Sequence, residues 1–127
     1  MTLIAALLVL LVALEHAGFL VLEMFLWTQP VAQRIFGLAP EAALASAPLA
    51  RTQGLYNGLL AAGLLWTFLI GDPNRRRNLR ILLLIGVLVA AAFGGITARP
   101  LVFVLQGVPA IVTFVFVRFA DEWRGGS

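Results

Sequence analysis

Apolar residues dominate the chain in long runs, and polar residues fill the connections between these runs. Each run approaches the length that a helix needs to cross a bilayer core, about 20 residues. The runs lack the alternation of barrel strands, and a membrane supplies no water to backbone groups, so helices are the spanning structure that remains. The pattern predicts an all-α membrane protein, a single four-transmembrane-helix bundle over residues 1–127, with helices at about residues 3–27, 53–70, 79–98 and 101–119.

The connection between the first two predicted helices, residues 28–52, is too polar and too rich in proline to span. Pro40 followed by Glu41 is typical of a helix start, and Pro48 predicts that this helix is short. Val31 to Phe36 has the pattern of an interfacial turn. We therefore expect a short lid-like loop, although a plain connection explains the same pattern with fewer assumptions.

Composition supports the membrane class, since 61% of the residues are hydrophobic, 12% are charged and the mean hydropathy is +1.00. These values lie far outside the usual range of soluble domains. A cleaved signal peptide is the competing interpretation of the first run. That run lacks a basic start and exceeds the roughly 7–15 apolar residues of a signal sequence, so we expect this helix to be retained.

Every basic residue is an arginine, and the arginines are distributed unevenly. If four helices alternate in direction, one side carries Arg75, Arg76, Arg77, Arg80, Arg118 and Arg124, whereas the other carries Arg34, Arg51 and Arg99. The positive-inside rule then predicts a multi-pass protein of the bacterial inner (plasma) membrane with both termini in the cytoplasm. The same bias explains the sequence pI of about 11.1. The chain has no soluble basic domain with interleaved aromatic residues, so we expect no nucleic-acid partner.

The residue types exclude several kinds of chemistry. The chain contains no cysteine and one histidine, which rules out thiol catalysis and thiolate ligands and predicts no metal site. Phosphate-binding loops, nucleophile elbows and zinc-binding helix motifs are missing from the sequence. The identity of any cofactor stays unknown at this stage.

The first apolar run contains the ionisable residues that matter most, Glu15, His16 and Glu23. A charged side chain at the centre of a spanning helix is disfavoured by roughly 2.5–3.5 kcal/mol, so such residues usually face a protein interior or a wet cavity. His16, Glu23 and Trp27 recur at helical spacing and share one face. His16 and Glu23 are separated by roughly 10 Å along the axis, so a ligand or water would have to bridge them.

The alternation of helix direction brings several polar residues to a common depth in the outer half of the membrane. We expect them to form a polar pocket, with Glu23 and His16 as catalytic proton carriers. The candidate ligand-binding residues are Glu15, Trp27, Gln53, Tyr56, Asn57, Arg99 and Gln106. For any single amide, an interhelical hydrogen bond worth ~0.6–2 kcal/mol is the simpler explanation. The aromatic side chains are also typical of a membrane-interface belt, and an arginine can extend its charge to the interface.

Small residues recur every four positions on two predicted helices. Gly54, Gly58 and Ala62 form one series, and Ala90, Gly94 and Ala98 form another. Such series let helix backbones approach closely and permit a homodimer. Pro109, in the last predicted helix, removes a backbone donor and predicts a bend near Gln106.

Six short blocks cover nearly the whole chain: Val12 to His16, Leu22 to Trp27, Phe36 to Leu38, Gln53 to Gly58, Gly94 to Thr97 and Gln106 to Ala110. Together they resemble an uncharacterised family of small bacterial integral-membrane proteins, catalogued as a domain of unknown function. The blocks Glu-Met-Phe-Leu-Trp and Gln-Gly-Leu-Tyr-Asn-Gly are the most specific. The resemblance implies a four-helix inner-membrane protein. It supports the interpretation that the residues in these blocks belong together, but it implies no activity.

Three functions fit these observations. The first needs the fewest assumptions: a binding protein whose pocket holds a lipophilic small molecule, lipid or quinone-like, through Glu23, Asn57, Gln53 and Gln106, with Trp27 stacking on it. The second is a proton-coupled small-molecule transporter that uses a membrane-embedded glutamate of the first helix to exchange protons for a cation. It would resemble the small multidrug-resistance exporters in architecture but not in motifs. The third is an intramembrane enzyme that performs acid–base chemistry on a lipid, limited to proton transfer because nucleophile motifs are missing. In each case the surrounding partner is the lipid bilayer.

Overall fold

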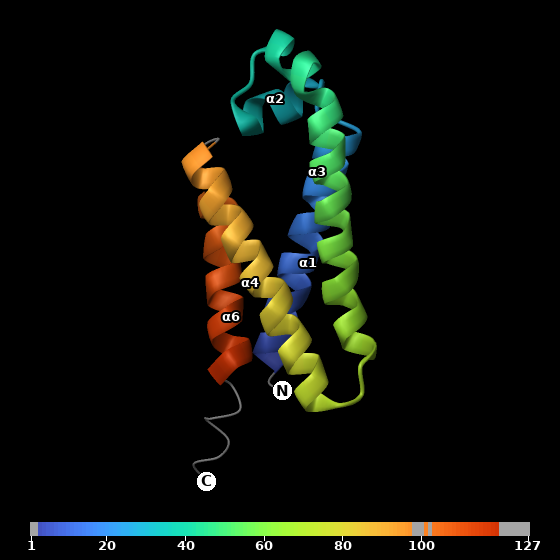
Figure 1. Cartoon of the computed structure of the whole chain (residues 1–127), viewed down its shortest axis with the longest axis vertical. Coiled ribbons are helices and arrows are strands. Elements are labelled where there is room, and N and C mark those ends of the chain that lie inside the picture. The colour runs from blue at the N-terminus through green and yellow to red at the C-terminus, as the bar shows by residue number, and fades with distance from the viewer. Residues whose placement is uncertain (1–2, 98–100, 102, 120–127) are drawn as a thin grey trace. The chain divides into compact units, whose positions relative to one another are not determined.

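A computed structural model of the chain describes residues 3–97, 101 and 103–119, and the regular elements in these ranges are all helices (Figure 1). In chain order they are α1 (Leu3–Met24), α2 (Pro30–Phe36), α3 (Pro40–Trp66), the 3-10 helix η1 (Thr67–Leu69), α4 (Pro73–Thr97), the π-helix η2 (Phe103–Gly107) and α6 (Val108–Phe119). The predicted all-α class therefore holds for the described part of the chain.

The helices belong to two compact units. Unit 1 consists of Met1–Ala13 and Gly63–Ser127, and unit 2 consists of Leu14–Ala62. Helices α1 and α3 each contribute residues to both units. The two units are described separately below.

Unit 2 is a helical hairpin made of the second half of α1, the short helix α2 and most of α3. Helix α2 begins with Pro30 at a position that needs no backbone N–H, and it ends at Gly37. Gly37 has φ 66° and ψ 38°, the left-handed conformation in which its N–H donates to the Gln33 carbonyl. Because a residue with a Cβ rarely adopts this conformation, Gly37 allows the sharp reversal of the chain before α3.

Helix α3 differs from the sequence prediction, which placed a lid-like loop up to residue 52 and a short helix ending near Pro48. The helix begins at Pro40 and continues through Pro48 to Trp66. Its first turns are rich in alanine, the strongest helix former, and this preference outweighs the backbone hydrogen bond that proline removes. The predicted loop consists instead of α2 and the first half of α3.

Helix α4 also begins earlier than predicted, at Pro73 rather than near residue 79. Asp72 caps this start, because its Oδ1 atom accepts hydrogen bonds from the backbone N–H of Asn74 (2.9 Å) and of Arg75 (3.3 Å). The run of arginines that follows therefore belongs to the first turns of the helix. A sequence argument based on hydropathy starts the helix too late, because the first turns of α4 are charged.

In unit 1, α4 packs against α6, and the two helices run in opposite directions (Figure 1). The π-helix η2 ends directly before α6, whose second residue is Pro109. A π-helix is a rare element with i→i+5 hydrogen bonds, and here it occupies the place at which Pro109 predicts a bend near Gln106. Thr113 Oγ1 donates to the Pro109 carbonyl at 2.7 Å and lies 3.5 Å from the Leu8 carbonyl, which links α6 to the first half of α1.

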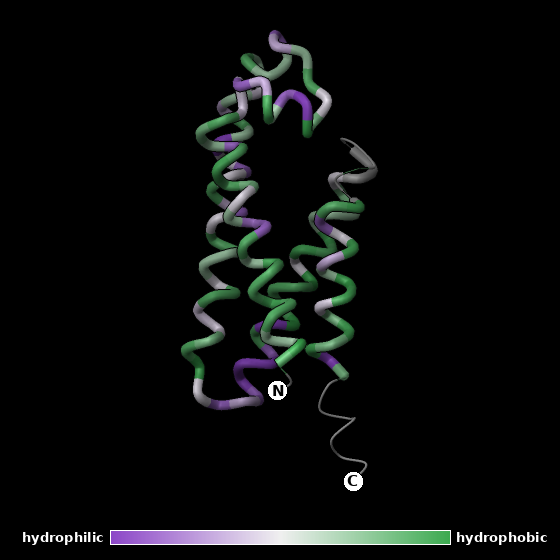
Figure 2. The backbone as a smooth tube through the Cα atoms, turned by 180° about the vertical axis from the view of Figure 1, so that it is seen from behind, coloured by the Kyte–Doolittle hydropathy of each residue, from purple (hydrophilic) through white to green (hydrophobic). Residues whose placement is uncertain are grey.

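Within the described residues, two helical segments, Leu3–Met24 and Pro73–Gly94, are long and apolar enough to cross a membrane, and Val104–Phe119 is a shorter apolar helix. Their side chains are mostly outside the packed interior, since 28% and 22% of the two spans are buried. Leu3, Leu7 and Leu11 on one face of α1 are each more than half exposed. Figure 2 shows that apolar residues dominate these helices and that hydrophilic residues gather in the connections. A core helix of a soluble domain would bury most of its apolar side chains. Exposed apolar side chains of this extent fit helices that contact lipid better.

Candidate functional site

A hydrogen bond between two polar side chains joins α1 to α3 in unit 2. Glu23 lies in the last turn of α1 and is 5% exposed. Asn57 Nδ2, on α3, donates to Glu23 Oε1 at 2.6 Å. The bond links residues 34 positions apart in the sequence, so it exists only when the hairpin is closed. It satisfies one oxygen of a nearly buried carboxyl group, which would otherwise be costly in apolar surroundings.

Two glycines of α3 allow the close approach of α1 that this bond requires. A Cβ added at Gly54 would meet Met24 Cγ at 2.6 Å, Glu23 Cβ at 3.1 Å and the Leu20 carbonyl oxygen at 3.3 Å. A Cβ at Gly58 would clash with Leu20 Cδ1. The small-residue series expected for helix packing is therefore used inside the hairpin, between α1 and α3.

The other candidate residues of α3 are more exposed than Asn57. Gln53 is exposed and Tyr56 is 62% exposed, whereas Asn57 is half-buried against α1. Gly54 and Gly58 face α1, and Gln53 and Asn57, four residues apart, border the same flank of this face. In the described structure, Asn57 is the residue of this trio that meets Glu23.

Trp27 lies one turn beyond Glu23 in sequence and makes two contacts in unit 2. Its Nε1 atom donates to Ser46 Oγ at 3.0 Å, and its ring lies 4.9 Å from the Phe36 ring at an interplanar angle of 47°. These contacts connect the end of α1 to α2 and to the first turns of α3. The sequence prediction assigned ligand stacking to Trp27 but did not identify Ser46. The only sequence feature that could have indicated this contact is the presence of a serine in the first half of α3.

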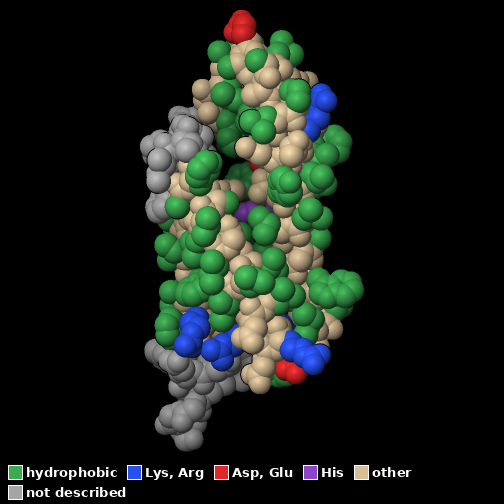
Figure 3. Space-filling view, viewed as in Figure 1, with side chains coloured by type: hydrophobic (Ala, Val, Ile, Leu, Met, Phe, Trp, Pro, Cys, Tyr) green, Lys and Arg blue, Asp and Glu red, His purple; other side chains and the backbone are tan. Residues whose placement is uncertain are grey.

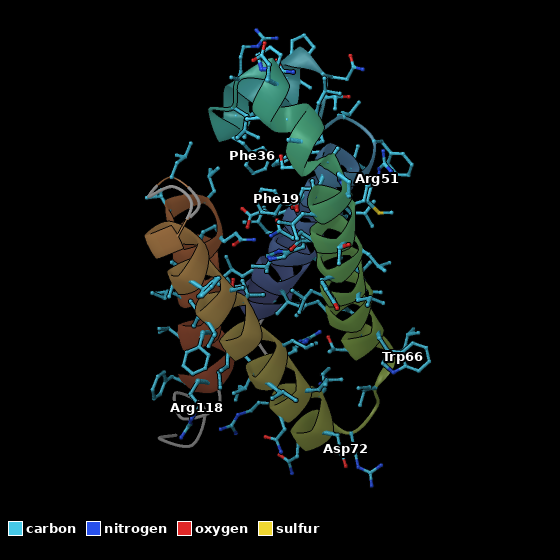
Figure 4. The ribbon with its side chains drawn as sticks, turned by 45° about the horizontal axis from the view of Figure 1, so that its top comes forward. Phe19, Phe36, Arg51, Trp66, Asp72 and Arg118 are labelled. Carbon is cyan, nitrogen blue, oxygen red and sulfur yellow. The ribbon has the colours of Figure 1, made fainter. Side chains whose placement is uncertain are left out.

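His16 and Glu15 lie in the middle of α1. His16 is fully buried, and its ring meets the Phe19 ring edge-on at a centroid distance of 5.7 Å. Glu15 is half-buried, and its Oε1 atom is shielded from solvent without a hydrogen-bond partner among the described residues. Figure 4 shows Phe19 and Phe36 in unit 2, with Arg51 projecting outward from α3.

The remaining predicted residues lie outside unit 2. Gln106 is half-buried in the π-helix η2 of unit 1. Arg99 lies outside the described residues. For a metal ion, the described ranges contain no group of three or more acidic, histidine or cysteine side chains that could bind it.

The sequence interpretation missed a buried arginine in unit 1. Arg80 is fully buried, its Nε donates to Thr67 Oγ1 at 2.7 Å, and its guanidinium carbon lies 4.5 Å from the centre of the Phe68 ring. It had been grouped with the preceding arginines as a topology signal. Its position inside an apolar run, separated from Arg77 by two residues, was the feature that distinguished it.

Residues 10–118 match the family described as "Protein of unknown function (DUF1304)". The chain belongs to this family. It is also similar to the "Uncharacterized protein YpaA" of Lactococcus lactis subsp. lactis (strain IL1403), with 31% identity over 117 residues, which is 91% of this chain and 97% of the relative. No solved structure matches the chain significantly. The resemblance inferred from the sequence blocks is thereby confirmed.

Proposed function

We propose that this DUF1304 protein is a multi-pass protein of the bacterial inner membrane that binds a lipophilic small molecule through the Glu23–Asn57 pair. The membrane placement is supported by the two apolar spans and by the large share of their side chains that lies outside the interior. The arginines at the start of α4 and the end of α6 favour the cytoplasm for that end of unit 1.

The observation that carries the proposal is the 2.6 Å bond between Asn57 Nδ2 and the nearly buried Glu23. This bond uses one carboxyl oxygen and one amide hydrogen. The second carboxyl oxygen, the amide oxygen and the second amide hydrogen are the groups that a ligand would meet. They suit an apolar molecule whose polar head both donates and accepts hydrogen bonds, such as a lipid or a hydroquinone.

The test is the identification of molecules that co-purify with the protein in a mild detergent, by native mass spectrometry. We expect the wild type to retain a lipophilic molecule and Glu23→Gln to reduce its occupancy by about tenfold, a change of 1.4 kcal/mol. Glutamine keeps the size of the side chain and an oxygen that accepts from Asn57. The matched control is Tyr56→Phe, because Tyr56 is exposed on α3. An empty wild type, or equal retention by Glu23→Gln, would contradict the proposal.

A second candidate function, proton-coupled transport, is favoured by Glu15. Its shielded Oε1 places a second carboxyl group on α1, two turns before Glu23. Carboxyl groups in series along one spanning helix are typical of proton pathways. Flux of a lipophilic cation into proteoliposomes under a pH gradient should then fall at least tenfold in Glu15→Gln. Flux that needs no gradient, or that this substitution leaves unchanged, would remove the transporter from consideration.

A further inference from the structure

Glu23 is a nearly buried acidic residue in a unit whose arginines are all exposed. Unit 2 contains two arginines, Arg34 and Arg51, and the structure describes all of its residues. Arg34 Nε donates to the Pro30 carbonyl at 3.4 Å, and Arg51 projects outward from α3 (Figure 4). Figure 3 shows arginine side chains near the two ends of the visible face, with mostly hydrophobic side chains between them. A buried carboxylate is usually paired with a positive charge, so a bound cation would complete the charge balance at Glu23.

The length of the bond from Asn57 indicates that the Glu23 carboxyl group is ionised. Asn57 Nδ2 donates at 2.6 Å, whereas N–H···O bonds between neutral groups are typically about 2.9–3.0 Å long. Bonds to an ionised acceptor are shorter and stronger. His16 is the other side chain of α1 that can carry a positive charge, but it lies two turns before Glu23, roughly 10 Å along the axis. The described side chains of unit 2 therefore leave the negative charge of Glu23 unneutralised.

The hydrogen-bonding groups of the pair define the kind of cation that fits. Glu23 Oε2 and Asn57 Oδ1 are acceptors, and the second amide hydrogen of Asn57 is a donor. A primary ammonium group carries three N–H donors and can serve both acceptors at once. An oxygen close to the ammonium in the same molecule would accept the amide hydrogen. An ammonium beside an oxygen is the head of ethanolamine lipids and of lipophilic amino alcohols.

The position of Glu23 along α1 suits a ligand of this kind. Glu23 lies in the last turn of the apolar span Leu3–Met24. In the proposed membrane setting, the end of a span lies where the acyl chains meet the headgroups. Apolar side chains are exposed on both helices near the pair, namely Val21 on α1 and Leu55 and Leu59 on α3. A lipophilic amine can therefore reach the pair with its head while its chain stays against apolar surface.

We propose that the Glu23–Asn57 pair binds the primary ammonium group of a lipophilic amine. The inference rests on the proposed function, because it names the class of ligand for the same site. Glu23 Oε2 and Asn57 Oδ1 each accept an N–H of the ammonium, and Asn57 donates its second amide hydrogen to an oxygen of the ligand head. Two sources supply this chemistry, a two-chain phospholipid with an ethanolamine head and a single-chain amino alcohol.

The test titrates phospholipids with identical acyl chains onto the detergent-purified full chain and follows binding by native mass spectrometry. Phosphatidylethanolamine and phosphatidylcholine have the same net charge, but three methyl groups replace the N–H donors in phosphatidylcholine. We expect phosphatidylethanolamine to bind about tenfold more tightly. The monomethyl lipid keeps two N–H donors and the dimethyl lipid keeps one, so the affinity should fall most from the second methyl group onward.

Glu23→Gln should reduce the preference for phosphatidylethanolamine to within about twofold. The matched control is Glu41→Gln, which makes the same change at an exposed carboxylate in the first turn of α3 and should keep the preference. The methylation series uses the wild type alone, so it tests the proposal even if Glu23→Gln does not fold. Equal binding of phosphatidylethanolamine and phosphatidylcholine, or a preference that Glu23→Gln leaves unchanged, would overturn the proposal.

A second pair of probes distinguishes the two sources. Sphinganine, a single-chain amino alcohol, is compared in the same assay with octadecanol, which has no amino group. Tighter binding of sphinganine than of phosphatidylethanolamine assigns the site to single-chain amines, and the reverse assigns it to the phospholipid. Octadecanol binding as tightly as sphinganine, or a co-purified ligand without an amino group, would overturn the ammonium assignment and leave the proposed function intact. A wild type that is purified empty and binds none of these probes would overturn both.

Discussion

Replacement of Gly54 by leucine is expected to separate α1 from α3 and to lower the free energy of unfolding by about 1–3 kcal/mol. The first added carbon already lies 3.1 Å from Glu23 Cβ and 3.3 Å from the Leu20 carbonyl oxygen. Met24 can rotate away, but the backbone of α1 cannot yield without moving the helix. The measurement is unfolding of the purified protein in a detergent mixture of increasing SDS content, followed by tryptophan fluorescence.

The matched control for this prediction is Gly18→Ala in α1. A Cβ at Gly18 would meet nothing within 4 Å. Alanine is the better helix former by about 1 kcal/mol, so this variant should be as stable as the wild type or more stable. A Gly54→Leu protein that unfolds at the wild-type SDS fraction would show that α1 and α3 do not approach each other as described.

Replacement of Asn57 by leucine should destabilise the hairpin by about 1–3 kcal/mol, because the nearly buried Glu23 loses its donor. The double variant Glu23→Leu/Asn57→Leu removes both polar groups together and should recover part of the loss. The resulting double-mutant cycle measures the interaction between the two side chains, and we expect a coupling of about 0.5–2 kcal/mol. The unfolding assay is the one used for Gly54.

Additivity of the two single substitutions within about 0.3–0.5 kcal/mol would indicate that the pair is not coupled. Gln53→Leu serves as the control, since Gln53 is exposed on the same helix four residues earlier. It should change the stability by less than about 0.5 kcal/mol. A larger effect at Gln53 than at Asn57 would mean that the polar contact lies one turn earlier on the same flank of α3.

The all-α class and the close approach of a helix to the Gly54 and Gly58 face of α3 were predictable, because long apolar runs and small residues every four positions depend on local spacing alone, whereas the identity of the partner helix, α1, was not. The face that α3 presents was predicted less well. A spacing of four residues showed that Gln53 and Asn57 lie near one another, but it did not show which flank turns toward α1. The glycines decide this, since α1 can approach only where side chains are missing.

The extent of α3 and the burial of Arg80 were not predictable for a related reason. Both depend on a balance between local preferences and packing. Pro48 is a strong local signal for a helix end, yet the alanines around it favour the helix. An arginine is usually exposed. Arg80 is buried because Thr67 Oγ1 accepts a hydrogen bond from its Nε and because its guanidinium lies over the Phe68 ring.

The 27 residues of α3 correspond to a length of about 40 Å at 1.5 Å per residue. The hydrocarbon layer of a bilayer is about 30 Å thick, so α3 is about 10 Å longer than this layer. Hydrophobic mismatch depends on the apolar part of a helix alone, so in the proposed setting the polar first turns of α3, which contain Glu41, would extend into the headgroup region and the bilayer would not have to thicken.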